Sequence, residues 1–156
     1  NTIELIKSYV DSHPDTLLVI TADHETGGLS VGSDGKYDWK PAVISGIQKS
    51  VDVIASKLSE SKNNELYTNW LELTQLTLNH DQQHALLSAK LQSKSALIAF
   101  TRETINTASL TGWTSGGHTA ADVPILAYGV KSEQFAGFRD NAEVGSILFE
   151  ILQNSD

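Results

Sequence analysis

The sequence lacks several residues and segments that would place it in particular classes of protein. None of the 156 residues is cysteine, so disulfide bonds and thiolate metal ligands are excluded, and any metal site must use histidine and carboxylate groups. No apolar run approaches the roughly 20 residues that a helix needs to cross a bilayer. Eleven lysines and arginines against nineteen aspartates and glutamates give a net charge of -8, which would repel a phosphate backbone. A membrane-spanning or nucleic-acid-binding role is therefore not expected.

Methionine is also absent, and the first residue is Asn1. We therefore expect the chain to be cut from a longer protein. The remaining composition, 40% apolar and 19% charged, is that of an ordinary globular protein, and the length suits one domain or a piece of a larger one.

The N-terminal part shows both helical and strand patterns. Apolar residues at helical spacing predict a helix over residues 2–12. The nearly unbroken apolar run at 16–22 is typical of a strand that helices cover on both faces, and we expect a central parallel strand there. Asp34-Gly35, between two short β-favouring stretches, predicts a hairpin turn, and this turn explains Ser33 better than a role as a nucleophile does.

The stretch between residues 40 and 110 is predicted to be almost purely helical. Apolar residues at steps of three and four indicate one helix from about Pro41 to Ser59. After a polar loop at 60–65, the apolar stripe that starts at Leu66 predicts another helix. Two more helices are expected over 80–91 and 93–109.

Strand patterns return after this helical stretch, at 112–115 and 123–130. A last helix should begin with Asp140 or Asn141 as its cap. Its buried face is predicted to consist of five apolar residues: Val144, Ile147, Leu148, Ile151 and Leu152. The order of helix, strand, hairpin, helical insert, strands and helix predicts a layered α/β domain.

The residues with metal-binding chemistry follow the predicted strand at 16–22. Ligands of open α/β sheets bind beyond the carboxyl ends of strands, where Asp23 and His24 would lie. Neighbouring residues of a strand point to opposite faces, so both can reach one metal only where the strand breaks, and the two glycines that follow favour such a break. A capping or turn pair is the alternative for Asp23-His24. His118, in a glycine-flanked loop, is either a ligand or a solvated surface residue.

The other histidines are predicted to be surface residues. His13 lies at the end of the first helix, where an imidazole can interact with the carbonyl end of the helix dipole. His80 and His84 have a spacing at which one helix face could hold a metal, but no glutamate stands between them as in the metalloprotease pattern.

Three blocks of the sequence together resemble the C-terminal portion of bacterial alkaline phosphatases. They are "VITADHETGG" at 19–28, "GWTSGGHTAADVPILAYG" at 112–129 and "FAGFRDNAEVGSILFEIL" at 135–152, in the order in which the family has them. This resemblance implies a layered α/β/α alkaline-phosphatase-like sheet, present here in part.

The resemblance also implies a division of the chain. Residues 1–39 and 111–156 would form the C-terminal part of the α/β domain, and residues 40–110 a helical insertion of the crown or lid kind at the entrance of the site. Four aromatic residues could line that entrance, although Trp70 at helical spacing fits the core better: Trp39, Tyr67, Trp70 and Phe100.

The function implied by the resemblance is the hydrolysis of phosphate monoesters with two zinc ions, a nearby magnesium ion and a serine that becomes transiently phosphorylated. Carried over by motif, Asp23 and His24 would bind the zinc that activates the serine. His118 would bind the zinc that activates the attacking water. Two such cations can stabilise the attacking and leaving oxygens of an in-line displacement.

The motifs for the rest of that site are missing from these residues. In the family, the serine nucleophile, the phosphate-binding arginine, the magnesium ligands and the remaining zinc ligands lie upstream. Arg102 and Arg139 stand in no nucleophile motif, so surface roles are predicted for both. We therefore expect no catalytic nucleophile in this chain and no activity of the chain alone.

Further expectations follow from the resemblance and from the missing strands. The family is exported to the periplasm or outside the cell and often forms a homodimer. An unpaired sheet edge would favour self-association or pairing with the missing N-terminal part. Two alternatives stay open: a non-catalytic phosphatase-like binding module, and a phosphodiesterase or sulfatase of the same superfamily.

Overall fold

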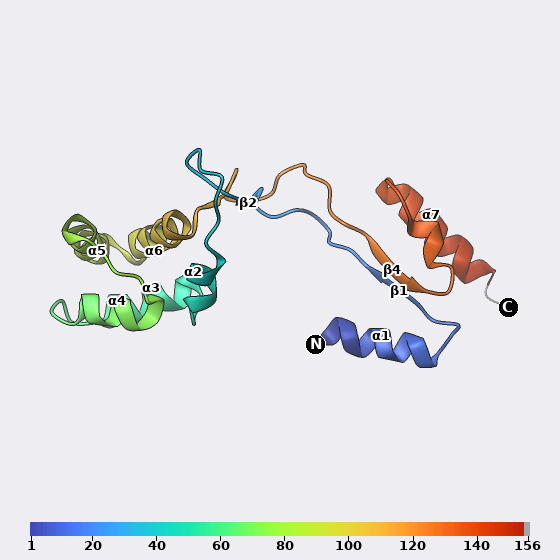
Figure 1. Ribbon diagram of the computed structural model, residues 1–156, viewed down its shortest axis with the longest axis horizontal. Coiled ribbons are helices and arrows are strands. Elements are labelled where there is room, and N and C mark those ends of the chain that lie inside the picture. The colour runs from blue at the N-terminus through green and yellow to red at the C-terminus, as the bar shows by residue number, and fades with distance from the viewer. Residues whose placement is uncertain (155–156) are drawn as a thin grey trace. The chain divides into compact units, whose positions relative to one another are not determined.

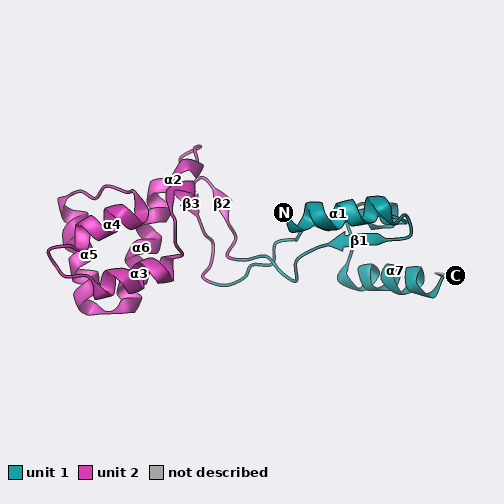
Figure 2. Cartoon of the chain, turned by 90° about the horizontal axis from the view of Figure 1, so that it is seen from below, with its two compact units in different colours: residues 1–26, 117–156 teal, residues 27–116 magenta. Residues whose placement is uncertain are grey.

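The computed structural model describes residues 1–154, which form two compact units (Figure 2). Unit 1 comprises Asn1–Thr26 together with the chain from Gly117 onward, and unit 2 comprises Gly27–Gly116. Unit 1 contains the mixed α/β part of the chain, and unit 2 contains most of its helices (Figure 1). The division into 1–39 with 111–156 and an insertion of 40–110 stays a prediction.

Unit 1 is built from a two-stranded sheet and three helical segments: α1 (Thr2–Ser12), β1 (Leu17–Ile20), β4 (Leu126–Gly129), the 3-10 helix η1 (Ser132–Phe135) and α7 (Asn141–Gln153). Helix α1 has the predicted bounds. Its first turn is closed by a capping box, in which the Asn1 side chain accepts from backbone N–H groups while the Glu4 side chain bonds back to the Asn1 amine. Figure 1 shows β1 and β4 side by side.

The prediction of a central parallel strand at 16–22 was wrong in its pairing. Strand β1 pairs with β4 in the antiparallel direction, from Leu17 opposite Gly129 to Ile20 opposite Leu126. All four β1 residues are half-buried. An apolar run reports how much of a strand is covered, but it contains no information about the direction of the neighbouring chain.

Helix α7 begins as predicted but buries less than predicted. Asp140 is the N-cap of a capping box, with its side chain bonded to Ala142 N at 2.8 Å and the Glu143 side chain bonded to Asp140 N at 2.8 Å. Of the expected buried face, Ile151 is buried, whereas Leu152 is 72% exposed. The 3.6-residue period identifies the apolar side of the helix, and the packing partners decide how much of that side is covered.

Unit 2 contains five helices and a two-residue strand pair: β2 (Ser30–Val31), α2 (Pro41–Gly46), α3 (Val51–Glu60), α4 (Leu66–Thr74), α5 (His80–Gln92), α6 (Lys94–Ser109) and β3 (Thr111–Gly112). Its core is centred on Trp70, which is fully buried, and on aliphatic residues from α3 to α6: Ile54, Leu58, Leu66, Leu86 and Leu97. The Trp70 Nε1 donates to Leu76 O at 2.8 Å, and Phe100 packs edge to face against the indole with ring centroids 5.5 Å apart. Trp70 is therefore a core residue, as its spacing predicted.

The helix expected from Pro41 to Ser59 was wrong as a single helix. It is broken into α2 and α3, because α2 ends at Gly46, a poor helix former, and the backbone at Ile47 and Ser50 is extended. The turn at Asp34-Gly35 is present, with Lys36 N bonded to Ser33 O at 3.0 Å.

The hairpin expected around that turn is absent from the described residues, since β2 pairs instead with β3. A turn signal of two residues specifies the reversal of the chain and leaves the strand partner open. The strand predicted at 112–115 is present only as β3, which ends at Gly112.

Candidate functional site

The antiparallel pairing of β1 with β4 brings the predicted metal ligands of unit 1 together. Ile20, the last residue of β1, lies opposite Leu126, the first residue of β4. The segment that leaves β1 therefore runs beside the segment that enters β4, and the Thr21 hydroxyl donates to Pro124 O at 3.2 Å beyond the end of the ladder. Asp23 and His24 are on the first segment and His118 precedes the second.

His24 is oriented by the backbone that follows it. Its Nδ1 lies 2.7 Å from Glu25 O, and because a carbonyl oxygen only accepts, Nδ1 is the donor. In the neutral ring, Nε2 then has the free lone pair that a metal ligand needs. This nitrogen lies 3.6 Å from Asp23 Oδ2.

Asp23 and His24 lie in a bend of the chain and contact each other. Its Oδ1 accepts from His24 N at 3.0 Å, which leaves Oδ2 directed toward the imidazole. The Asp23 side chain is 86% exposed and that of His24 is 42% exposed. This contact between Asp23 and His24 leaves one carboxylate oxygen and one imidazole nitrogen accessible.

His118 lies against His24. The two ring centroids are 3.7 Å apart with the planes tilted by 37°. All three residues named from the sequence are thus in one place within unit 1, although their role as metal ligands stays a prediction. Among residues 1–154, no group of three or more histidine, aspartate or glutamate side chains is arranged to hold one metal ion.

Two residues of this site were missed from the sequence. Glu25 and Thr119, which directly follow His24 and His118, are joined through the Glu25 carboxylate, since Oε2 accepts from Thr119 N at 2.8 Å and also from the Thr119 hydroxyl. Their position beside the predicted ligands in both motifs was the available signal. An open hollow of about 1160 Å³ adjoins these residues and is lined by Asp23, His24, Glu25 and Thr119 among others.

In unit 2, the glycines of "ETGG" contact the residues of "GWTS". Gly27 O accepts from Thr114 N at 2.8 Å and from Ser115 N at 3.1 Å. The Trp113 ring lies directly over Gly27, and its Nε1 donates to Asn106 Oδ1 at 3.1 Å. These contacts join the two sequence motifs within unit 2.

The remaining histidines are exposed, as predicted. His13 caps the end of α1 and stacks on Tyr9 with centroids 3.9 Å apart. His80 and His84 lie on the exposed side of α5.

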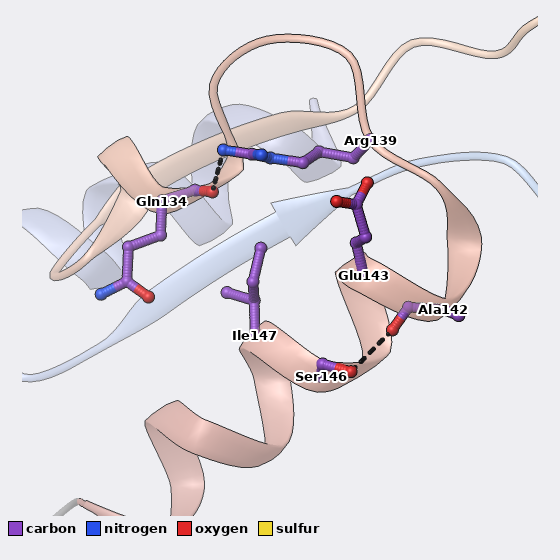
Figure 3. A pocket seen from close by; sticks show the side chains of 6 residues that line it. All are labelled: Gln134, Arg139, Ala142, Glu143, Ser146 and Ile147. Carbon is purple, nitrogen blue, oxygen red and sulfur yellow. Dashed lines mark hydrogen bonds between the residues drawn. The ribbon is translucent and has the colours of Figure 1, made fainter.

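Arg139 lies in a surface pocket of unit 1 between η1 and α7 (Figure 3). Its Nη2 donates to Gln134 O at 3.3 Å, and the facing Glu143 is the capping-box residue of α7. Both Arg139 and Arg102 are exposed, which agrees with the surface roles predicted for them.

Two of the aromatic residues considered for the site entrance form hydrogen bonds within unit 2. The Trp39 Nε1 donates to Thr111 Oγ1 at 3.1 Å, and the Tyr67 hydroxyl accepts from Leu78 N at 3.4 Å.

No helix within residues 1–154 has the length and apolar content of a membrane span.

Comparison with known proteins gives consistent results. The alkaline phosphatase family model matches residues 2–154. Alkaline phosphatase 3 of Bacillus subtilis is 40% identical over 152 residues, which covers 92% of this chain and 31% of the relative, and alkaline phosphatase 4 of the same organism is 34% identical over 147 residues, with 92% and 30% covered. The crystal structure of a cold-active alkaline phosphatase from the psychrophile Shewanella sp. matches with a TM-score of 0.91 and 36% identity, covering 96% of this chain and 37% of that one. The chain thus spans about a third of the length of these relatives.

Proposed function

The chain belongs to the alkaline phosphatase family, and from this premise we propose that it supplies part of the two-zinc site of a phosphate monoesterase. Asp23 and His24 would hold the zinc that activates a serine nucleophile, and His118 would hold the second zinc. The serine, the remaining zinc ligands and the magnesium ligands would come from sequence other than these 156 residues, which correspond to about a third of the relatives.

The observation that supports this proposal is the pair formed by Asp23 and His24. With Nδ1 donating to Glu25 O, the neutral imidazole presents an acceptor nitrogen to an acceptor carboxylate oxygen 3.6 Å away. A metal cation between two acceptors at this separation would bind to both, whereas a proton on Nε2 would pair them as an ordinary ion pair. Zinc bonds of about 2 Å at a tetrahedral angle would place the two donor atoms about 3.3 Å apart, so the donor set and its spacing fit Zn²⁺.

The chain's own residues would prepare the site in two ways. The Glu25 carbonyl holds His24 in the tautomer that binds a metal through Nε2, and the backbone N–H of His24 holds the Asp23 carboxylate in place. Bound zinc would supply a lowered pKa for an oxygen nucleophile and a positive charge for the transferring phosphoryl group.

Zinc titration of the 156-residue chain by calorimetry tests the ligand assignment. His24→Ala and His118→Ala should each weaken zinc binding by at least about 10-fold, whereas His80→Ala, an exposed histidine of unit 2, should leave it unchanged. Equal zinc affinity in His24→Ala and His80→Ala would refute the assignment, as would the absence of zinc binding by the native chain.

An activity assay tests where the nucleophile comes from. The chain alone should not hydrolyse a chromogenic phosphate monoester, even with zinc and magnesium present, because no serine nucleophile motif is among its residues. Turnover by the chain alone would show that the attacking group lies within it. A complete protein that prefers a phosphodiester or a sulfate ester would contradict the proposed substrate class.

Unit 1 exposes apolar side chains that suit contact with further protein. Leu5 of α1 is 73% exposed, Phe149 of α7 67% and Leu126 of β4 59%, and a sheet of two strands is marginal in isolation. We infer that the rest of an alkaline phosphatase, or a second copy of the chain, covers these surfaces. Sedimentation of the isolated chain should show self-association if a second copy covers these surfaces, and a strictly monomeric chain would contradict that form of the inference.

Export to the periplasm or the cell exterior is proposed on the family resemblance alone. Cell fractionation of the source organism would check it, and recovery of the protein only from the cytoplasm would refute it.

A further inference from the structure

Glu25 connects the two segments of unit 1 that contain the proposed ligands. Its Oε2 accepts from the backbone N–H of Thr119 at 2.8 Å and from the hydroxyl of the same residue. The two residues are 94 positions apart in the sequence, and both are half-buried. A hydrogen bond to an ionised carboxylate is roughly twice as strong as a bond between neutral groups, and here one oxygen accepts two bonds.

This contact lies beyond the end of the β-ladder. Pairing of β1 with β4 ends at Ile20 and Leu126, so the backbone hydrogen bonds of the sheet do not extend to residues 23–25 or to residues 118 and 119. Contacts outside the ladder therefore help to determine how these segments lie relative to each other. The bond from Glu25 to Thr119 is such a contact at the level of the proposed ligands.

The position of Glu25 gives it two effects on the histidines. Its backbone carbonyl accepts from His24 Nδ1 at 2.7 Å and so orients that ring. Its side chain holds Thr119, the residue next to His118, and the two rings lie 3.7 Å apart between their centroids. One residue thus orients His24 and positions the segment of His118.

We propose that Glu25 is a positioning residue that keeps the ligand segments of the two zinc sites in register. This inference rests on the function proposed above, because it takes Asp23, His24 and His118 as ligands. Loss of the Glu25 side chain should let the His118 segment move away from His24 and weaken zinc binding, although Glu25 itself need not touch the metal.

The first test needs no metal. In the metal-free 156-residue chain, NMR should detect a nuclear Overhauser effect between the ring protons of His24 and His118. Glu25→Ala should abolish it. Glu133→Ala, which removes an exposed carboxylate of the same unit and changes the charge equally, should retain it. Persistence of the effect in Glu25→Ala would overturn the proposal.

The second test uses zinc alone as the probe. Glu25→Ala should weaken zinc binding by about 10- to 100-fold, the range typical of partners that orient metal ligands. Glu25→Gln, whose amide oxygen can accept the same bonds without a charge, should lose less, and Thr119→Val should fall between Gln and Ala because the backbone N–H remains. Circular dichroism verifies folding, and Glu25→Gln serves if Glu25→Ala does not fold.

The outcomes separate this inference from the proposed function. Zinc binding that is lost in His24→Ala but unchanged in both Glu25 variants would overturn the positioning role and leave the ligand assignment intact. Absence of zinc binding by the native chain would overturn the proposed function and, with it, the role of Glu25 in metal binding.

Discussion

Gly27 occupies a position where alanine is disfavoured for two independent reasons. Its φ of +76° lies in the left-handed region, which costs an L-residue about 1–2 kcal/mol. A Cβ atom there would lie 2.6 Å from Trp113 Cε3, and overpacking of this kind costs about 1–3 kcal/mol. Movement of the indole away from residue 27 would also disturb its hydrogen bond to Asn106 Oδ1. Gly27→Ala should therefore destabilise this contact by about 2–5 kcal/mol.

Amide hydrogen exchange measures this effect where it arises. Thr114 N and Ser115 N donate to Gly27 O, so their protection reports the opening of this contact. At about 1.4 kcal/mol per factor of ten, Gly27→Ala should reduce their protection by about 30-fold or more, up to complete loss.

Gly35→Ala is the matched control. Gly35 has nearly the same backbone conformation, with φ of +68°, but no atom lies within 4 Å of a Cβ built there. It should therefore incur only the backbone cost at its own turn and leave the Thr114 amide protected. In a Trp113→Ala background, the effect of Gly27→Ala should shrink by the share that comes from the clash. Unchanged protection in Gly27→Ala, or the same effect in both backgrounds, would refute the reasoning.

Two further predictions concern stability. The hydrogen bond from Lys7 Nζ to the Tyr128 hydroxyl raises the pKa of Lys7 above its ordinary value, so the stabilisation from this contact between α1 and β4 is complete below about pH 10.4 and is lost as the pH rises through the raised pKa. Tyr128→Phe should lower the Lys7 pKa measured by NMR, and an unchanged pKa would contradict this cause. In the core of unit 2, Trp70→Ala should cost about 3–5 kcal/mol and Trp70→Phe about 2 kcal/mol, because the bond to Leu76 O is lost with part of the volume. Urea unfolding followed by circular dichroism measures both, with the fully exposed Tyr37→Ala as a control that should change little.

The helices were the part of the fold most readable from the sequence. The bounds expected for α1, α5 and α6 agree with the structure within one or two residues, because periodicity and caps are local properties of the chain. The break between α2 and α3 was missed although Gly46 and Ser50 were visible, since the apolar period continued across it. A period shows which side of a helix is apolar and does not show that the helix is continuous.

The strands were less predictable, because their partners are distant in the sequence. The apolar run of β1 was recognised, but its antiparallel pairing with β4 depends on residues 126–129. The two residues of β2 pair with β3 and not across the neighbouring turn. Short strands gain their stability from the chain beside them, so their own residues leave the choice of neighbour undetermined.

The sequence by itself determined which residues have metal-binding chemistry and which family the motifs resemble. Asp23, His24 and His118 were named from their residue types, their neighbours and that resemblance, because a motif is a local feature. Only the tertiary structure placed His118 against His24 and joined Glu25 to Thr119. These contacts bridge 94 positions and depend on the direction in which β1 and β4 pair, which no local pattern specifies.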